Sequence, residues 1–343
     1  MMIKPDIEFE QQARTRQAQL TKPPGALGRL EDIACWFAAR QRRAIPVPLI
    51  PAITVFAGDH GVTAEGVSAF PSVVTGEMVR NFARGGAAIN VLARAIGARL
   101  TVVDAGVASP LGDVANIVHG NVRHGTGNLL LAAAMTHAEA QQAVALGRTQ
   151  ARADISAGAN LLIAGEMGIG NTTASACLIC LFTGADADAV VGHGTGIDSG
   201  GRTHKVGVVR RALTRVEQKP CNDGIDYLVE VGGLEIAAMA GYYLEAAEAG
   251  VPALLDGFIS AAAALAARAL EPGVTDWLIA SHLSLENGHR LALAELGLNP
   301  LLDLEMRLGE GSGAAMAVPL LQAALTLHAE MATFIEAGVS EKA

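Results

Sequence analysis

The chain has 343 residues, of which 51% are apolar and only 4% aromatic, and its net charge is −9. This composition is typical of a globular enzyme and excludes a disordered or fibrous chain. The absence of a basic stripe argues against a nucleic-acid partner.

The first segment, Met1 to Gln19, is too polar for a signal peptide, and no apolar run reaches membrane-spanning length. The most apolar candidate, Pro252 to Leu270, is interrupted by Asp256 and Arg268. We therefore expect a cytoplasmic protein that does not enter a membrane. Its length favours one large domain with a smaller one.

The first fifty residues predict helices. Residues 22–41 open with Pro and Gly and place apolar side chains at helical spacing, from Leu27 to Phe37. The proline-rich segment Ile45 to Pro51 then indicates a boundary.

Beyond this boundary a pattern repeats: a short apolar run ends in Gly, Asp, Glu or His, and most runs lead into a helical stretch. Continuous apolar runs of four or five residues are typical of strands buried on both faces, which predicts an α/β fold with a parallel sheet and helices on each side. The six predicted strand regions are Ile53–Gly61, Leu100–Val107, Leu161–Gly170, Ala189–Gly196, Pro252–Gly257 and Asp276–His282.

Polar residues concentrate at the ends of these runs. Ligands of parallel α/β sheets bind beyond the carboxyl ends of the strands, so we expect these side chains to converge on one crevice. They are Asp59, His60, Asp104, Glu166, His193, Asp256 and His282. The segments Gly76–Gly97, Thr136–Gly158 and Ala314–Ala337 are predicted helices.

Two glycine-rich segments are candidate phosphate sites. In GEMGIGNTT, from Gly165, a predicted strand is followed by a glycine turn and a helix start, where free N–H groups favour an anion. This segment has neither the ending of a P-loop nor the third glycine of a dinucleotide fingerprint. The segment Gly192–Gly201 precedes Lys205, which can supply positive charge. Helix capping explains the first segment equally well, and a surface loop the second.

The segment RLGEGSG, Arg307 to Gly313, holds a single carboxylate, Glu310, between two glycines at a predicted helix start. Glycines allow close approach of the backbone to a ligand, which favours a carboxylate presented for chemistry. The alternative is an acid that caps the next helix. The G-x-G-x-x-A pattern in this segment does not open a βαβ unit, and this excludes a Rossmann dehydrogenase.

Neither the cysteines nor the histidines form a recognisable metal motif. Cys177 and Cys180 form a CxxC, but they lie in an apolar helical segment without a second pair. We interpret them as core residues of a protein from a reducing compartment, with a redox or metal role as the alternative. His60, His193 and His282 have no metal-ligand spacing in the sequence, although three strand-end histidines can meet in space.

Several motifs stand in the order of a known family. GALGRLE, FAGDHGV, SAFPSVVTGEMV, GEMGIGNTT, VGHGTGIDSGG, ALLDGFI, SHLSLENGH and RLGEGSGAA resemble those of the nicotinate-nucleotide–dimethylbenzimidazole phosphoribosyltransferases. The resemblance implies transfer of ribose 5-phosphate from nicotinate mononucleotide to 5,6-dimethylbenzimidazole, which gives α-ribazole 5′-phosphate for the lower ligand of cobalamin. It also implies a homodimer, no cofactor and no metal. For the fold, it implies an α/β domain of residues 46–319 and a small helical domain of residues 1–45 and 320–343.

The resemblance also implies roles for individual residues. Glu310 is the expected general base, because the attacking heterocycle must lose a proton as it bonds to the sugar. Glu166 is expected to stabilise positive charge on the ribose. The expected substrate-binding residues are Gly168, Lys205, Ser284, Arg307 and Gly309 for the phosphate, Ser72 and Met167 for the benzimidazole, and Leu308.

Two alternatives stay open. A transferase that uses the pyrophosphate-activated sugar needs paired acids before a glycine loop, and VVDAGVAS has only Asp104. A non-catalytic nucleotide-binding module on the same fold is a different class, because a fold does not fix a function.

Overall fold

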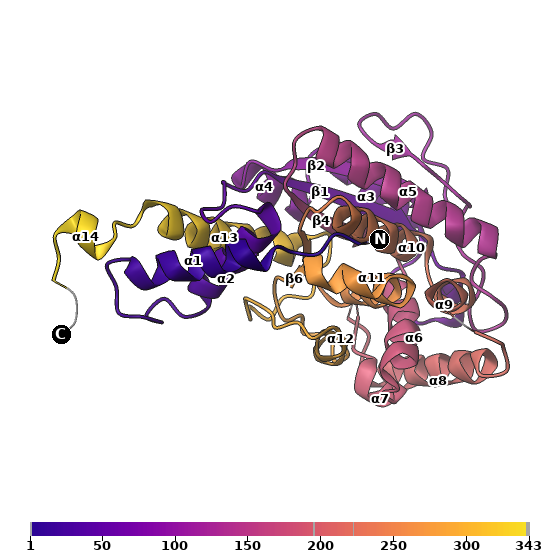
Figure 1. The fold of residues 1–343 in the computed structure, drawn as a ribbon. Helices are drawn as coiled ribbons and strands as arrows, with labels where there is room; N and C mark the ends of the chain where they lie inside the picture. Colours follow the sequence, from indigo (N-terminus) through magenta and orange to yellow (C-terminus); the bar gives the residue numbers. More distant parts are fainter. Residues whose placement is uncertain (1, 195, 222, 341–343) are drawn as a thin grey trace.

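A six-stranded sheet, parallel throughout, forms the centre of the protein. The structure is a computed structural model, and it describes residues 2–194, 196–221 and 223–340. The strand order is β3-β2-β1-β4-β5-β6, so the order reverses between β1 and β4, as in doubly wound folds (Figure 1). The strands are β1 (Pro51–Gly58), β2 (Arg99–Gly106), β3 (Val118–His119), β4 (Leu161–Met167), β5 (Ala253–Leu255) and β6 (Leu278–Ala280).

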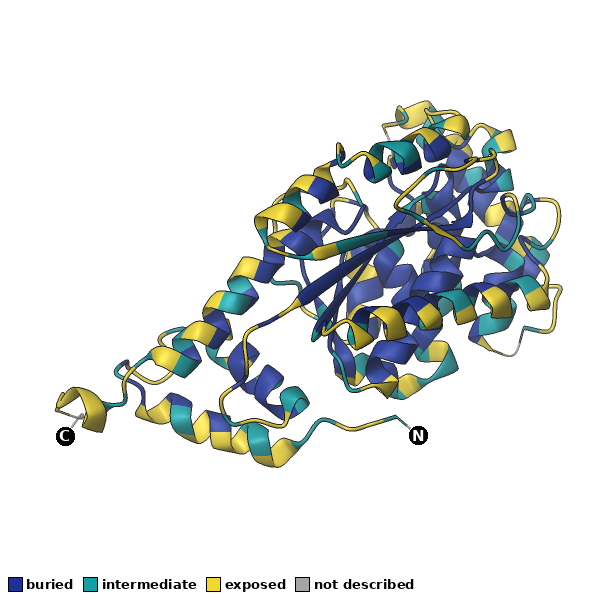
Figure 2. Ribbon diagram, turned by 90° about the horizontal axis from the view of Figure 1, so that it is seen from above, coloured by how far each residue is buried: buried dark blue, intermediate teal, exposed yellow. Residues whose placement is uncertain are grey.

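Alternation of side chains along each strand supplies two separate cores. In β1, Ala52 and Phe56 pack into one core, whereas Ile53, Val55 and Ala57 pack into the other. Figure 2 shows the buried strands between helices on both faces, and this confirms the predicted three-layer α/β fold. The first core includes residues of α5 (His137–Ser156), α6 (Asn171–Thr183), α8 (Ser199–Val216), α9 (Gly224–Val231), α10 (Leu234–Glu248) and α11 (Phe258–Leu270). The second includes residues of α2 (Arg29–Gln41), α3 (Val73–Ala83), α4 (Ala88–Ala95) and α13 (Ser312–Glu330).

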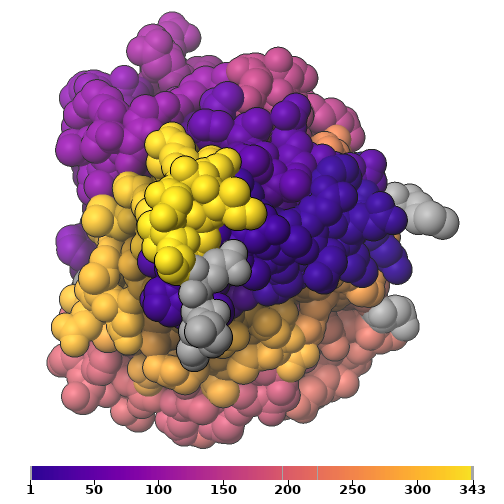
Figure 3. All heavy atoms as spheres, turned by 60° about the vertical axis from the view of Figure 1, so that its left-hand side comes forward, coloured from indigo at the N-terminus to yellow at the C-terminus, as the bar shows by residue number. Residues whose placement is uncertain are grey.

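The two ends of the chain lie side by side. Figure 3 shows the C-terminal residues against the N-terminal ones. Arg16 on α1 (Ile7–Gln19) donates to the carbonyl of His328 on α13 at 2.9 Å, and the side chains of Gln17 and His328 are hydrogen-bonded at 2.8 Å. A short helix, α14 (Phe334–Ala337), follows α13. The division into domains of residues 46–319 and of residues 1–45 with 320–343 remains a prediction.

One predicted strand is wrong. Of the predicted strand 189–196, residues 189–190 belong to the short helix α7 (Ala187–Val190), residues 191–194 and 196 form no strand, and residue 195 lies outside the described residues. The Asp186 side chain caps α7 by accepting a hydrogen bond from the Asp188 N–H, and the apolar run is too short to continue through the glycines that follow. The sheet still has six strands, because the two-residue strand β3, which was not predicted, is added at its edge.

The predicted helices also differ in detail. Residues 76–97 contain two helices, because the chain turns at Gly85, whose φ is 81°, between α3 and α4. The long C-terminal helix ends at Glu330, before α14. The remaining elements are α12 (His289–Leu296) and two short 3-10 helices, η1 (Gly61–Glu65) and η2 (Pro272–Trp277).

The expectation about apolar runs needs one correction. Helix α13 has 19 residues and is long and apolar enough to cross a membrane by length and composition. However, 56% of it is buried inside the protein, where Ala314, Val318 and Leu321 join the second core. A buried core helix has the same length and composition as a membrane span.

Glycines allow α5 and α10 to pack closely. A Cβ on Gly147 would lie 1.7 Å from the carbonyl oxygen of Ala238, and one on Gly241 would lie 2.0 Å from that of Val144. The two helix backbones are therefore in direct contact, and neither position has room for a methyl group.

We expect Gly147→Ala to destabilise the protein by about 1–3 kcal/mol, because the added methyl group forces the helices apart. The control is Gly207→Ala on α8, where a Cβ meets nothing within 4 Å; it should be neutral or stabilising by up to about 1 kcal/mol. Urea unfolding of both variants checks this. Equal stabilities would contradict the packing argument.

Candidate active site

A cavity of about 370 Å³ opens at the carboxyl ends of β4, β5 and β6. Its apolar wall comes from Phe70, which precedes α3, from Val74 and Met78 on α3, and from Met167 and Leu308. Its polar wall combines carboxyl groups with helix N-termini. The lining residues of this wall include Glu166, Gly168, Asn171, Thr172, Gly194, Asp256, His282, Ser284, Glu286, Arg307, Gly309 and Glu310.

Glu166 stands at the end of β4 and is buried. Its carboxyl group accepts a hydrogen bond from the Asn171 side-chain amide at the N-terminus of α6. Burial, reinforced by the negative charges of Asp256 and Glu235, raises the pKa of Glu166 to about 8. Near neutral pH this carboxyl group is therefore mostly protonated.

Glu310 has a left-handed backbone conformation that residues other than glycine rarely adopt. Its φ is 63°, between Gly309 at 85° and Gly311 at 86°, so three successive residues are left-handed. A non-glycine residue in this conformation costs free energy and persists only where surrounding structure holds it. The Glu310 side chain is buried, and its Oε2 accepts a hydrogen bond from the Ile89 N–H at 3.2 Å. Burial and the nearby Asp256 charge raise the pKa of Glu310.

The close approach of this turn to the sheet explains the glycine at position 165. A Cβ on Gly165 would lie 2.2 Å from the Glu310 carbonyl oxygen. Gly309, next to Glu310, lies against the Glu166 side chain in the same way: a Cβ on Gly309 would lie 2.1 Å from Oε1 of Glu166. The two carboxyl-bearing segments are thus packed backbone to backbone, with no room for side chains between them.

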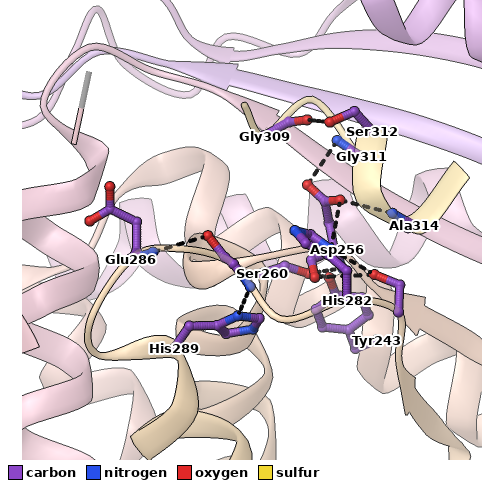
Figure 4. Close-up of polar contacts among 12 residues, drawn as sticks. Tyr243, Asp256, Ser260, His282, Glu286, His289, Gly309, Gly311, Ser312 and Ala314 are labelled. Carbon is purple, nitrogen blue, oxygen red and sulfur yellow. Dashed lines mark hydrogen bonds and ion pairs between the residues drawn. The ribbon is translucent and has the colours of Figure 1, made fainter. Parts of the chain in front are cut away.

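Asp256 holds the turn from below (Figure 4). Its two oxygens accept hydrogen bonds from the Gly311 N–H at 3.2 Å and the Ala314 N–H at 3.0 Å. The carboxylate therefore caps α13, where the helix dipole favours negative charge. His282 packs against the first turn of α13: a Cβ on Gly313 would lie 2.0 Å from its Nδ1. Burial still raises the pKa of Asp256, against the opposing effect of His282.

A second cluster of polar groups lies around β6 and α6. The Ser284 N–H donates to Nδ1 of His289 at 2.9 Å, and burial lowers the pKa of His289 to about 3, so the ring stays neutral and can accept. Lys205 on α8 is buried and donates to Oγ1 of Thr172 at 2.7 Å. Burial lowers the pKa of Lys205 to about 8, although the Glu286 charge opposes this effect. Arg307 donates to the carbonyl oxygen of Gly194 at 3.1 Å.

Most of the predicted site residues lie together, but two stand outside the cavity wall. Ser72, at the start of α3, bonds through its hydroxyl to Thr63 at 3.0 Å, whereas Phe70 and Val74, two residues away on either side, line the cavity. Lys205 lies behind Thr172. The residues that line the cavity are Glu166, Met167, Gly168, Ser284, Arg307, Leu308, Gly309 and Glu310.

The prediction that the polar strand-end residues converge on one crevice is correct for only some of them. Glu166, Asp256 and His282 line the cavity, whereas Asp59, His60, Asp104 and His193 do not. The reason is that three of these four side chains have hydrogen-bond partners elsewhere in the protein. His60 bonds to Glu235 at 2.6 Å in the interior, Asp59 accepts from the Ala108 N–H, and Asp104 from the Val107 N–H. His193 is exposed on the loop that replaces the predicted strand.

Sequence reasoning missed Glu286 as a site residue. It lies in the quoted SHLSLENGH motif, in the loop that follows β6 and six residues after its last residue, Ala280, so the strand-end signal that singled out Glu166 does not apply to it. Sequence reasoning quoted the segment of the apolar wall only as part of the SAFPSVVTGEMV motif, because the sequence does not show that Phe70, which precedes α3, and Val74 and Met78 on α3 face one cavity.

No metal site emerges from the residues that the structure describes. Within residues 2–194, 196–221 and 223–340, no group of three His, Cys, Asp or Glu side chains could hold a metal ion. All four cysteines are free. Cys177 and Cys180 are buried in α6, and burial raises the pKa of the Cys180 thiol to about 12. This environment agrees with their interpretation as core residues.

Fold and cavity together define an α/β protein of the class that binds a ligand at the carboxyl ends of parallel strands, here in a cavity with buried carboxyl groups beside an apolar wall. A family model described as phosphoribosyltransferase matches residues 2–339. The chain is 62% identical over 339 residues to the nicotinate-nucleotide–dimethylbenzimidazole phosphoribosyltransferase of Chromobacterium violaceum, covering 98% of this chain and 97% of the relative. It is 52% identical to the protein of the same name from Pseudomonas aeruginosa, covering 98% and 96%.

A solved structure gives the same result. The crystal structure of CobT from Thermus thermophilus superposes with a TM-score of 0.94 at 51% identity, covering 98% of this chain and all of that one. The chain belongs to this phosphoribosyltransferase family and is a pentosyltransferase.

Glu166 should make stability depend on pH. With a pKa of about 8 against the usual 4.5, the folded state keeps a proton that the unfolded chain has lost between these values, so the free energy of unfolding falls as pH rises through this window. We expect Glu166→Gln to be more stable than the unsubstituted protein at pH 8, by about 1–4 kcal/mol. Near pH 4.5 the difference should shrink.

Urea unfolding at both pH values measures this difference. The exposed Glu305 provides the matched control, since Glu305→Gln should leave the pH dependence unchanged. A Glu166→Gln protein with the pH dependence of the unsubstituted one would show that Glu166 titrates normally.

Proposed function

We propose that the enzyme transfers the ribose 5-phosphate of nicotinate mononucleotide to 5,6-dimethylbenzimidazole, giving nicotinate and α-ribazole 5′-phosphate for the lower ligand of cobalamin. The relatives at 52% and 62% identity carry the name of this activity over nearly the whole chain. The observation that carries the proposal in the structure is the buried carboxyl group of Glu310, held in the cavity by a left-handed turn.

Glu310 is proposed as the general base. One ring nitrogen of the benzimidazole bonds to the anomeric carbon of the ribose. The bond from this carbon to nicotinate breaks, and its electron pair returns to the pyridinium nitrogen. The benzimidazole then has to lose the proton of its other nitrogen, which the Glu310 carboxylate accepts. Attack opposite the leaving group converts the β-linkage into an α-linkage, and the leaving group is already a cation, so the departure requires no acid.

Glu166 is proposed to face the positive charge that develops on the ribose. Its pKa of about 8 reflects burial and the negative charges of Asp256 and Glu235, and a cationic substrate lowers the pKa of a neighbouring carboxyl group. The pyridinium ribotide would therefore ionise Glu166 on binding. The Asn171 amide, which already donates to this carboxyl group, would then stabilise the anion.

The polar wall supports the proposed position of the phosphate near Gly168, Lys205, Ser284, Arg307 and Gly309. The N-terminus of α6 presents backbone N–H groups at this wall, a favourable place for an anion. The apolar wall supports a place for the benzimidazole near Ser72, Met167 and Leu308, because it offers Phe70 and Val74 to a flat ring.

Three further properties are part of the proposal: that the enzyme is a homodimer, that it acts in the cytoplasm, and that its two chain ends form a separate helical domain. Leu308 is 57% exposed and Phe70 49% exposed beside the cavity, which agrees with a mouth that a second subunit covers.

Incubation of the purified protein with nicotinate mononucleotide and a panel of benzimidazoles, purines and phenols tests the activity. We expect a ribotide of 5,6-dimethylbenzimidazole and free nicotinate, detected by mass. Absence of any ribotide product would refute the proposed function.

Glu310→Gln should lower turnover by about 10²- to 10⁴-fold, the usual contribution of a general base, while nucleotide binding by calorimetry stays within a few-fold. The glutamine can still accept from the Ile89 N–H, so the turn should survive. Glu305→Gln is the matched control, because Glu305 is also an acid at positive φ, 55°, but is exposed. Full turnover in Glu310→Gln would favour a binding module over this mechanism.

The pH dependence of kcat/KM should also report this base. Since Glu310 must be ionised to accept a proton and its pKa is raised, activity should fall on acidification while the pH is still above 4.5, the usual pKa of glutamic acid. Initial rates between pH 4 and 9 measure this limb. A rate that stays constant down to pH 4.5 would contradict Glu310 as the base.

A further inference from the structure

Glu286 is a buried carboxylate in the cavity wall that no proposed step has used. Its side chain is 8% exposed, and its Oε2 has no hydrogen-bond partner in the structure. Lys205 forms its hydrogen bond with Thr172 instead. Figure 4 shows the Glu286 carboxylate directed away from the Asp256 and His282 cluster.

The other carboxyl groups of this wall already have partners. Glu166 bonds to the Asn171 amide, Glu310 to the Ile89 N–H, and Asp256 to two N–H groups of the turn and helix that follow Glu310. Among the described residues that line the cavity, Oε2 of Glu286 is the one buried side-chain atom without a hydrogen bond. A buried carboxylate with an unused acceptor costs free energy, so a ligand in the cavity that donates to the Glu286 carboxylate would be favoured.

The backbone beneath Glu286 is fixed before any ligand arrives. The Glu286 N–H donates to the Ser284 hydroxyl at 3.3 Å, and its carbonyl accepts from the His289 N–H at 3.0 Å. The Leu285 N–H donates to the carbonyl of Met306, next to Arg307, at 3.1 Å. This turn is therefore tied to the chain segment that carries Glu310.

The position of the carboxylate is fixed by a glycine. A Cβ on Gly192 would lie 2.1 Å from Oε2 of Glu286, so the carboxylate rests against the bare Cα of Gly192. An alanine at position 192 would have to displace the carboxylate without removing its charge.

The proposed substrate offers few groups that can donate to a carboxylate. The phosphate and the nicotinate carboxylate are anions without a proton to give at neutral pH, and they would be repelled. The ribose carries two neighbouring hydroxyls, and an acidic side chain that accepts from ribose hydroxyls is a common device of nucleotide sites. The Glu286 carboxylate lines the same cavity as Arg307, and its charge acts on Lys205, so its position suits a sugar that is attached to a phosphate bound by these cationic residues.

We propose that Glu286 accepts hydrogen bonds from the ribose hydroxyls of the mononucleotide and selects ribonucleotides over deoxyribonucleotides. This inference rests on the proposed function. A site built to hydrogen-bond a hydroxyl discriminates against the analogue that lacks it, because its buried polar group is then left unpaired. For a charged acceptor we expect a preference of roughly 10- to 100-fold.

The experiment compares nicotinate mononucleotide with its 2′-deoxy and 3′-deoxy analogues, each with 5,6-dimethylbenzimidazole, and measures kcat/KM. The unsubstituted enzyme should prefer the ribonucleotide by roughly 10-fold or more over one analogue or both. The analogue that is rejected identifies the hydroxyl. In Glu286→Gln this preference should fall towards unity, mainly through loss of activity with the ribonucleotide. Gly192→Ala should lower the preference in the same direction, and Glu305→Gln should retain it.

Each outcome decides the inference. An unsubstituted enzyme that uses all three nucleotides equally, or a Glu286→Gln enzyme that keeps the full preference, overturns it. If Glu286→Gln does not fold, as judged by its thermal transition, an unchanged preference in Gly192→Ala overturns the inference and a reduced one supports it. An unsubstituted enzyme that forms no ribotide from nicotinate mononucleotide refutes the proposed function instead, which separates the two failures.

Discussion

The hydrogen bonds from the N–H groups of Gly311 and Ala314 to Asp256 are the constraint on which the site depends. They join the end of β5 to the start of α13, and they hold the left-handed turn that presents Glu310. A carboxylate at this place satisfies orphan N–H groups of the helix and at the same time puts negative charge near two other carboxyl groups. The same residue therefore fixes the geometry of the site and raises the pKa values of Glu166 and Glu310.

Three buried carboxyl groups can lie this close together because each is stabilised in a different way. Glu166 keeps a proton, Asp256 accepts hydrogen bonds from two N–H groups at the start of α13, and Glu310 retains one N–H partner and lines the cavity. Divergent environments of this kind give chemically similar groups different roles. Glycines at positions 165, 309 and 313 make the arrangement possible, since a side chain at any of them would collide with the neighbouring segment.

The sequence predicted much of this site and less of its surroundings. The parallel sheet followed from continuous apolar runs, and β1, β2 and β4 lie within a few residues of the predicted positions. Residues 189–196 were predicted as a strand because their apolar run resembles the others; the capping side chain of Asp186, which starts a helix there, is a weaker signal. His60 and Asp59 stand at a strand end like Glu166, but their partners, Glu235 on α10 and the Ala108 N–H, are distant in sequence, and pattern alone cannot show which strand-end groups are paired internally.

By itself, the sequence determined the layered α/β architecture, the family and the glycine-flanked acid, because these depend on periodicity and on local motifs that one stretch of chain contains. Only the tertiary structure decided which strand ends share a cavity, which carboxyl group keeps its proton, and which one lacks a partner. Those properties depend on desolvation and on contacts between distant segments, such as Ile89 and Glu310, which are 221 residues apart, and such contacts exist only once the chain has folded.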